Sequence, residues 1–203
     1  MLILTAKHFE KLSERNSPFQ FPKYSKPILN IATQNSQATR VNVVGSMKEL
    51  FLEFLSNGGK SLQNWKDFYY AKNGEIRIEN SSERLHSMLK KMPVDAKVFT
   101  KELAKNYIID LVIYKTHFGM SGEYYSVLAV GDHFKLPVRW SNAKEESEGI
   151  DAWLGSYPIQ VKPHDSVKMN HVYNHADTNK TLVITYESKK DRCFIHNPEI
   201  INK

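Results

Sequence analysis

The 203-residue sequence has a single cysteine, Cys193, and no apolar run long enough to cross a bilayer. One thiol forms neither an internal disulfide nor a cysteine zinc site, so Cys193 is interpreted as a small apolar residue in the strand-like segment RCFIH. The N-terminal MLILTAKHFEKLSERN has an apolar stretch too short for a secretory signal, and no small-residue cleavage site follows it. These absences favour a soluble, cytoplasmic protein with no membrane partner.

Internal repeats, low-complexity segments and long linkers are also absent from the sequence. Hydrophobic residues make up 41% and charged residues 25%, which is ordinary for a globular protein with a packed core. A chain of 203 residues is long enough for one sizeable domain. We therefore expect a single domain over residues 1–203, with a mostly helical part at 1–130 and a small sheet at 131–203.

Acidic residues are fewer than basic ones, 22 against 28, which gives a formal net charge of +6 and a pI of about 9.2. A basic protein of this size favours a polyanionic partner, such as nucleic acid or an acidic membrane surface. Because many basic proteins bind neither, charge alone supports such a partner only weakly.

The clearest helix signal in the first half is SMKELFLEFLSNGG. Ser46 and Glu49 form a capping box, and apolar residues recur on one face of the helix that follows. Asn57, Gly58 and Gly59 then end it. The segment therefore predicts an amphipathic helix between residues 46 and 59.

The other segments of the first half give a mixture of helix, turn and irregular patterns. Two further helices are predicted at Ser82–Met92 and Asp95–His117. The apolar segment Tyr107–Tyr114 within the second one is also compatible with a strand, because periodicity does not separate the two here. Phe19–Ser46, which prolines interrupt, is expected to be irregular, and Asn73-Gly74 predicts a turn.

Strand patterns appear only in the second half. One short polar helix is expected between the first two strands, at Ser141–Glu148. The predicted strands are Phe134–Trp140, Ile150–Leu154, Tyr157–Lys162, Thr181–Glu187 and Arg192–His196. Helices followed by a small sheet predict an α+β (mixed α/β) fold with a helical N-terminal half and a small central mixed sheet.

One stretch, EESEGIDAWLGSYPIQVKP, brings together residue types that carry chemistry. Asp151 begins one predicted strand, and Gln160 and Lys162 lie on the next, two residues apart and therefore on the same face. Gly155-Ser156 joins the two strands as a tight hairpin. The hairpin is expected to bring a carboxylate, an amide oxygen and an ammonium group together at the edge of the sheet.

These groups suit phosphodiester hydrolysis with Mg²⁺, which prefers oxygen ligands and keeps several waters. Asp151 would supply the essential carboxylate, and the Gln160 side chain and a main-chain carbonyl, that of Val161, would complete the protein ligands. Lys162 would orient a water and offset negative charge. On its own, an Asp followed by Gln-x-Lys is a weak motif, and most chance matches are polar surface residues.

The same stretch resembles the PD-(D/E)XK nuclease superfamily, in which an acidic residue is followed across a hairpin by acid-x-Lys. Asp151 and Lys162 match this pattern, whereas Gln160 replaces the usual acid and removes one negative charge. The resemblance implies a compensating carboxylate on the preceding helix. Glu146 is the expected residue, with Glu145 and Glu148 as competitors.

A second resemblance covers most of the chain. FPKYSKPILNIATQNSQATRVNVVGSMKEL is similar to the N-terminal signature of the MjaI type II restriction endonucleases, and EESEGIDAWLGSYPIQVKP is similar to their C-terminal signature. This resemblance implies cleavage of double-stranded DNA at a short palindrome, CTAG being the expected type, by a homodimer. It also implies a companion DNA methyltransferase, a DNA-recognition role for residues 1–130 and a catalytic role for 131–203.

Residues that contact DNA are expected in two segments. Asn and Gln pair bidentately with adenine and Arg with guanine, whereas Lys suits phosphate. The candidates are Gln34, Asn35, Gln37 and Arg40 in the first segment, and Lys168, Asn170, His171 and Lys180 in the second. An ordinary solvated loop is the alternative for the first segment.

Three further features have structural explanations that compete with functional ones. Lys97, Lys101 and Lys105 recur every four residues, which is usual for a solvated helix face and less usual for phosphate contact. His171 and His175 have the spacing of helical zinc ligands but no clear third ligand. Asp110 lies in an apolar stretch and is expected to cap or pair structurally, with a metal role as the alternative. A non-catalytic DNA- or RNA-binding protein is the alternative function, which the neutral side chain at position 160 favours.

Overall fold

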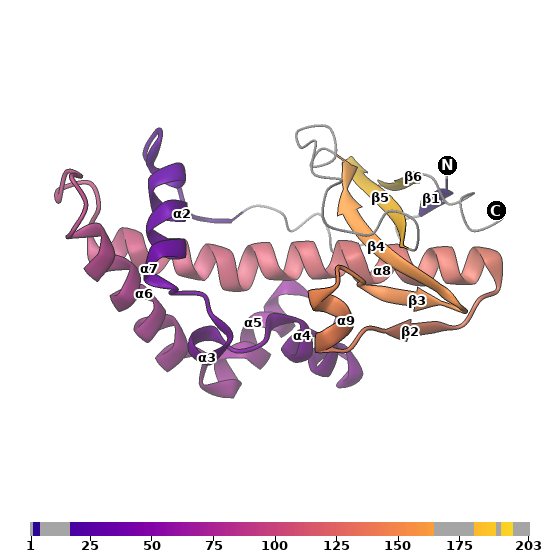
Figure 1. Cartoon of the computed structure of the whole chain (residues 1–203). Helices are drawn as coiled ribbons and strands as arrows, with labels where there is room; N and C mark the ends of the chain where they lie inside the picture. The colour runs from indigo at the N-terminus through magenta and orange to yellow at the C-terminus, as the bar shows by residue number, and fades with distance from the viewer. Residues whose placement is uncertain (1, 5–16, 165–180, 190–191, 197–203) are drawn as a thin grey trace. The chain divides into compact units, whose positions relative to one another are not determined.

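The described part of the chain, in a computed structural model, comprises residues 2–4, 17–164, 181–189 and 192–196. It divides into two compact units, which we describe separately (Figure 1). The sheet unit is Met1–Ser13 with Ser121–Lys203, and the helical unit is Glu14–Met120. No described helix is both long and apolar enough to span a membrane. The single domain expected over 1–203 stays a prediction.

The helical unit consists of short helices around a common core. Its elements are α2 (Ser25–Ser36), α3 (Val41–Val44), α4 (Met47–Ser56), α5 (Leu62–Tyr69), the π-helix η1 (Tyr70–Gly74), α6 (Glu75–Leu89), α7 (Lys101–Ile109), the π-helix η2 (Asp110–Lys115) and the first turn of α8 (Thr116–Phe134). Aromatic side chains form a cluster within this core, where Phe54 lies 5.5 Å from Trp65 and 5.4 Å from Phe51 between ring centroids.

The prediction of an irregular segment over Phe19–Ser46 is wrong, because α2 and α3 lie within it. Pro27 is the third residue of α2, and a proline in the first turn costs no helical hydrogen bond. Leu29, Ala32 and Thr33 are buried along one side of α2. The segment is therefore an amphipathic helix whose exposed side consists of residues with modest helix propensity.

The predicted helix after Ser46 is confirmed as α4, and the Ser46 hydroxyl accepts a hydrogen bond of 3.4 Å from the Glu49 amide. The second helix begins seven residues earlier than predicted, at Glu75. At the predicted turn, Asn73 adopts a left-handed conformation (φ 63°) that forms a kink inside η1, and α6 follows directly. The Asn73-Gly74 pair therefore marks a kink between two helices.

The third predicted helix is displaced at both ends. It starts at Lys101, where the Thr100 side chain accepts a hydrogen bond of 3.1 Å from the Leu103 amide, and not at Asp95. The helical backbone then continues through η2 and α8 to Phe134, well beyond the predicted end at His117. Tyr107–Tyr114 is therefore helical, and the strand alternative is wrong.

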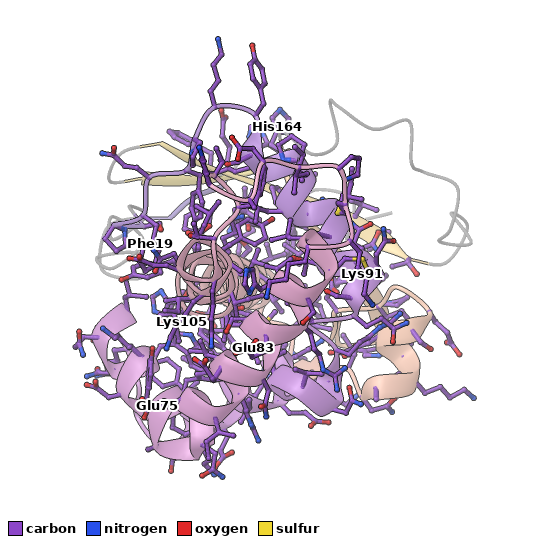
Figure 2. All side chains as sticks on the ribbon, turned by 90° about the vertical axis from the view of Figure 1, so that its left-hand side faces the viewer. Phe19, Glu75, Glu83, Lys91, Lys105 and His164 are labelled. Atoms are coloured by element: carbon purple, nitrogen blue, oxygen red, sulfur yellow. The ribbon has the colours of Figure 1, made fainter. Side chains whose placement is uncertain are left out.

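Structural pairing accounts for Lys101 and Lys105 of the three lysines that were predicted to share a helix face. Lys97 lies in a turn before α7, so its predicted place on that face is wrong. Lys101 pairs with Glu79 at 2.8 Å and also with Glu83, and Lys105 pairs with Glu79 at 3.0 Å. Figure 2 shows Glu83 on α6 and Lys105 on the neighbouring α7. Acidic partners thus neutralise this helix face, as expected for a solvated surface.

Asp110 also has a structural partner. Its side chain is buried at the start of η2, and its Oδ2 atom lies 3.4 Å from the Lys115 Nζ atom, one turn further along. Burial, followed by the charge of Asp110, raises the pKa of both Tyr107 and Tyr114. The expected structural pairing of Asp110 is confirmed.

The sheet unit contains six strands in the order β1-β6-β5-β4-β3-β2. They are β1 (Leu2–Leu4), β2 (Val138–Trp140), β3 (Ala152–Leu154), β4 (Tyr157–Pro163), β5 (Leu182–Lys189) and β6 (Arg192–His196), with the helix α9 (Ala143–Ser147) between β2 and β3. Only β4 and β5 are parallel, and all other neighbours are antiparallel. Parallel strands need a crossover connection, and the segment between β4 and β5, residues 165–180, lies outside the described ranges.

The strands alternate between a buried face and a more polar one. Ala152 and Leu154 of β3, Ile159 and Val161 of β4 and Ile184 of β5 share the buried face. Residues 121–134 of α8 cover this face, which explains two glycines in the helix (Figure 1). A Cβ atom on Gly122 would lie 2.6 Å from the Tyr186 ring, and one on Gly131 would lie 2.7 Å from Val138.

The predicted fold class, α+β with a helical N-terminal half and a small mixed sheet, is confirmed. The five predicted strands and the short polar helix α9 are present, although the first strand is shorter than expected and starts at Val138. β1 was not predicted, because its pairing with β6 joins opposite ends of the chain. The polar face of this sheet carries the candidate site.

Candidate active site

Asp151 and the strand β4 meet at the N-terminal end of β3. The Asp151 amide donates a hydrogen bond of 2.8 Å to the Ile159 carbonyl, and its Oδ2 atom accepts one of 2.7 Å from the Val161 amide. The carboxylate is therefore held against the backbone of the strand that carries Gln160 and Lys162. The predicted hairpin brings together the three residues that the sequence singled out.

Alternation along β4 separates the functional side chains from the core. Ile159 and Val161 are buried beneath the sheet, whereas Gln160 is half-buried and Lys162 is exposed. Asp151 precedes β3, where Ala152 pairs with Ile159, and this register places Asp151 on the same face as Gln160. A carboxylate, an amide and an ammonium group therefore line one face, as predicted.

Gly149 provides room for the Gln160 side chain. It has a φ of +83°, in the region that favours glycine, and a Cβ atom built there would lie 3.1 Å from the Gln160 Nε2 atom. Gly149 also donates its amide to the Glu146 carbonyl at 2.9 Å. The amide of Gln160 thus packs against the short connection between α9 and Asp151.

α9 carries the three glutamates considered for the compensating carboxylate, and their environments differ. Glu145 forms a capping box with Asn142, in which its carboxylate accepts a hydrogen bond of 2.9 Å from the Asn142 amide. The same carboxylate pairs with both terminal nitrogens of Arg139, at 2.8 and 3.0 Å. The Arg139 guanidinium, followed by the Asn142 amide, lowers the pKa of Glu145 to about 2. Glu145 therefore has a structural role in holding α9 on β2.

Glu146, within α9, and Glu148, at its C-terminal cap, remain as candidates for the compensating carboxylate. Glu148 is exposed, whereas Glu146 is half-buried one turn before Gly149. Gly149 lies next to the Gln160 side chain, and its amide bonds to the Glu146 carbonyl, so Glu146 is three residues along the chain from a residue that borders the site. This placement supports the choice of Glu146, which stays a prediction.

The polar face continues beyond Lys162 to a pair of histidines that the sequence reasoning missed. Register places Lys162 beside Thr185, and Thr185 beside His196 on β6. The rings of His164 and His196 stack at 4.2 Å, and His164 Nδ1 lies 3.3 Å from the Thr185 hydroxyl oxygen. The His196 Nε2 atom lies 3.7 Å from a Glu187 oxygen, and burial, followed by His164, lowers the pKa of His196.

One signal in the sequence pointed to part of this group. Gln160, Lys162 and His164 are two residues apart, so alternation along an extended segment puts them on one face. Nothing in the local sequence indicated Thr185 and His196, because their pairing depends on a parallel neighbour and its antiparallel partner. The structure therefore extends the predicted site by a second row of polar residues.

The described oxygen donors fit a hard divalent cation. The Asp151 carboxylate, the Gln160 side-chain oxygen and backbone carbonyls are the ligand types that Mg²⁺ accepts while it keeps several waters. Within residues 2–4, 17–164, 181–189 and 192–196, no cluster of three or more His, Cys, Asp or Glu side chains is arranged to hold a metal. A site here would therefore depend on neutral oxygens as much as on carboxylates.

The predicted DNA-contact residues fall into two groups. Gln34 and Asn35 are exposed near the C-terminal end of α2, Gln37 adopts a left-handed conformation (φ 53°) at its cap, and Arg40 is exposed before α3. Lys168, Asn170, His171 and Lys180 lie outside the described residues, as do His175 and the segment that joins β4 to β5. The first group shares the helical unit, and the catalytic candidates share the sheet unit.

Comparison with known proteins supports the same assignment as this geometry. Residues 26–200 match the family model described as MjaI restriction endonuclease. The chain belongs to this family. Family membership implies that DNA is the substrate, and it confirms the resemblance on which the sequence-based prediction of a restriction endonuclease depended.

Two relatives of this chain are type II restriction enzymes. The chain is 34% identical over 144 residues to MthZI of Methanothermobacter thermautotrophicus, which covers 71% of this chain and 69% of the relative. It is 27% identical over 203 residues to MjaI of Methanocaldococcus jannaschii, which covers 98% of this chain and 90% of the relative. No solved structure matches the chain.

Proposed function

We propose that this member of the MjaI restriction endonuclease family is a type II enzyme that hydrolyses phosphodiester bonds of double-stranded DNA with Mg²⁺. Its expected target is a short palindrome of the CTAG type. The observation that carries the proposal is the 2.7 Å hydrogen bond between Asp151 and the Val161 amide, which holds the carboxylate beside Gln160 and Lys162. Both relatives are type II restriction enzymes, which supports the same activity.

The proposed metal ligands are oxygens from Asp151, Gln160, Val161 and Glu146. In an extended strand the N–H and C=O groups of one residue point toward the same neighbouring strand. Because the Val161 amide points at Asp151, the Val161 carbonyl lies on that edge of β4 as well. When bound, Mg²⁺ stabilises negative charge on the scissile phosphate and acidifies water.

Lys162 is proposed to act on the substrate and the attacking water. Its side chain is exposed on the same strand face as Gln160, so its ammonium group reaches solvent. There it would orient the water for attack and offset the charge that develops on the phosphate. Gln160 would contribute a neutral oxygen, and Glu146 would restore the negative charge that a carboxylate at position 160 would have supplied.

DNA contacts are proposed for Gln34, Asn35, Gln37 and Arg40. A second set is proposed from the sequence at Lys168, Asn170, His171 and Lys180. A palindromic target is most simply read by a two-fold dimer, so we also propose a homodimer on DNA. Restriction activity further implies a companion methyltransferase that protects host DNA.

A cleavage assay on mixed-sequence duplex DNA, with and without Mg²⁺, tests the proposal directly. Discrete fragments that require the metal and disappear in the Asp151→Asn variant are the expected result. If the protein binds duplex DNA but leaves it intact in every divalent metal tried, the nuclease assignment fails. The non-catalytic DNA-binding alternative, which Gln160 favours, would then stand.

A further inference from the structure

α2 presents a solvent-exposed face composed almost entirely of uncharged side chains. Asn30 and Gln34 are one turn apart, and so are Ile31 and Asn35, and all four residues are exposed. The opposite side of α2 is buried through Leu29, Ala32 and Thr33. We call Asn30, Ile31, Gln34 and Asn35 the amide face of α2.

The amide face differs from other exposed helix surfaces in the same unit. The exposed surface of α6 and α7 carries lysines paired with glutamates, such as Lys105 with Glu79 at 3.0 Å. That is how a solvated helix face is usually built. Residues 17–48, which include α2, contain no aspartate or glutamate at all. Lys23, Lys26, Arg40 and Lys48 are the charged residues of this segment.

Large apolar side chains are exposed on α2 and next to it. Ile31 on the amide face is 50% exposed, and Tyr24, immediately before α2, is 73% exposed. Tyr24 adopts a left-handed backbone conformation (φ 66°), and the Lys23 ammonium group lies 4.9 Å from its ring centroid. A left-handed tyrosine is strained, so the surrounding fold must maintain this backbone conformation.

The position of α2 in the helical unit is fixed by its packing against α6. Its buried side packs against α6, and the Ser81 hydroxyl of α6 donates a hydrogen bond of 2.7 Å to the Ala38 carbonyl, just past the helix. A helix anchored in this way presents its exposed side chains from a fixed backbone, which favours specific recognition.

We infer that α2 is the recognition helix of the enzyme, inserted into the major groove so that its amide face reads A·T base pairs. An α-helix fits the major groove, where adenine offers an adjacent acceptor and donor and thymine offers its methyl group. The amides of Asn30 and Gln34 suit adenine, and the exposed Ile31 suits the thymine methyl group. The flanking Lys23, Lys26 and Arg40 suit phosphates on either side of the groove.

This inference rests on the proposed DNA endonuclease activity and adds to it. Gln34 and Asn35 were already proposed to contact DNA from their residue types alone. The structure adds Asn30 and Ile31, which local sequence did not single out, and it assigns them to one helix face. Gln37 and Arg40 lie beyond the C-terminal end of α2, so they belong to its flank and not to the reading face.

The test measures binding separately from cleavage. The full chain is used in Ca²⁺, which often permits binding without cleavage in such nucleases, and duplexes are selected from a random pool. The inference expects a consensus that contains A·T pairs. Asn30→Ala and Gln34→Ala should each bind that consensus roughly ten- to a hundred-fold more weakly, with little change on scrambled DNA. Gln63→Ala, which removes an exposed amide from α5, is the matched control and should change neither.

A chemical substitution in the DNA tests Ile31 directly. Replacing the consensus thymines by uracil removes only their methyl groups, which should weaken wild-type binding roughly fourfold for each contacted methyl. Ile31→Ala should bind the thymine duplex more weakly and should no longer distinguish thymine from uracil. Ile76→Ala changes an isoleucine that is 62% exposed on α6, and this control should discriminate as the wild type does.

The outcomes separate this inference from the nuclease proposal. If the wild type cleaves DNA in Mg²⁺ but the α2 variants keep the wild-type consensus and affinity, the recognition-helix inference is overturned and the nuclease proposal stands. If α2 variants lose the consensus while the wild type never cleaves, recognition stands and the nuclease proposal fails. Equal losses on consensus and scrambled duplexes would make α2 a phosphate clamp, and altered self-association without DNA would make it a protein interface. Either result, or no binding of DNA by the wild type, overturns the inference.

Discussion

The Oδ2 atom of Asp151 lies 2.7 Å from the amide nitrogen of Val161, which donates a hydrogen bond to it across the β3–β4 hairpin. The bond fixes one carboxylate oxygen of Asp151 against the backbone of β4. It also couples the proposed catalytic acid to the backbone of the strand that carries Gln160 and Lys162. Catalytic and structural contributions of Asp151 must therefore be separated in any mutational test.

Two substitutions at Asp151 achieve that separation. Asn keeps an oxygen that accepts the Val161 amide but removes the charge, so Asp151→Asn should fold normally and lose more than about a hundredfold in cleavage rate. Asp151→Ala should lose activity equally and also about 1 kcal/mol of unfolding free energy, because the partly buried hydrogen bond to the Val161 amide disappears. Cleavage rates and urea titrations check both. Near-normal cleavage by Asp151→Asn would show that the charge is not needed.

Lys162 offers a test in which stability should not change. Its side chain is exposed, so Lys162→Ala should unfold like the wild type while cleaving roughly a hundredfold or more slowly, since an electrostatic partner of the phosphate is lost. Lys144→Ala removes another exposed lysine from the sheet unit, on α9, and serves as the matched control. The role assigned to Lys162 is wrong if both variants slow cleavage to the same extent.

Gln160 is predicted to serve as a neutral oxygen ligand. Gln160→Glu keeps an oxygen at the same place and should retain measurable cleavage, whereas Gln160→Ala removes the ligand and should lose more. The Mg²⁺ concentration for half-maximal cleavage should rise for the Ala variant and not for the Glu variant. Full activity in both variants, with unchanged metal dependence, would show that Gln160 does not touch the metal.

Substitution of Gly149 is predicted to have two effects, backbone strain and a clash with Gln160. Substitution of a second glycine that has only the strain separates the two. Gly149→Ala places a side chain at a φ of +83° and 3.1 Å from the Gln160 amide nitrogen, so both stability and cleavage should fall. Gly58→Ala meets a similar φ of +79° with no atom within 4 Å, so it should cost a similar amount, about 1–2 kcal/mol, and leave cleavage unchanged. Equal cleavage by both variants would argue against a role for the Gly149–Gln160 contact.

The Glu145–Arg139 pair predicts a defined pH dependence of stability. The pKa of Glu145 is lowered from 4.5 to about 2 by Arg139 and by the Asn142 amide, so the unfolded chain takes up the proton more readily than the folded one. Its contribution should therefore be complete above pH 4.5 and lost as the pH falls toward 2. Urea titrations of Glu145→Ala should show a destabilisation that disappears over this range. The exposed Glu148→Ala should show none.

Local patterns in the sequence determined the elements whose signals lie within one short segment. Ser46 defines the start of α4 because a side-chain cap acts within a single turn, where its hydroxyl accepts the Glu49 backbone amide. Asp151, Gln160 and Lys162 were predicted to meet because a tight hairpin and a two-residue repeat set their geometry without help from the rest of the chain. These predictions needed no information on distant contacts.

Tertiary structure decided the features that depend on distant partners. α2 was read as irregular because amides and proline dominate its sequence, and its helix is stabilised by packing of one side against α6. Glu145 and Glu146 are neighbours in sequence, and only the position of Arg139 on β2 shows that the first of them is committed to a structural ion pair. Helix propensity and composition are weak predictors of secondary structure wherever tertiary packing supplies most of the stabilisation.

The row formed by Lys162, Thr185 and His196 shows the same division within the site itself. Sequence determined that Lys162 faces away from the core, since alternation along one strand is a local property. Only the sheet decided that Thr185 and His196 lie beside it, because the register of β4 with β5, and of β5 with β6, is set by pairing between segments that are separated along the chain. A strand determines which way its own side chains point, and the fold determines which side chains they meet.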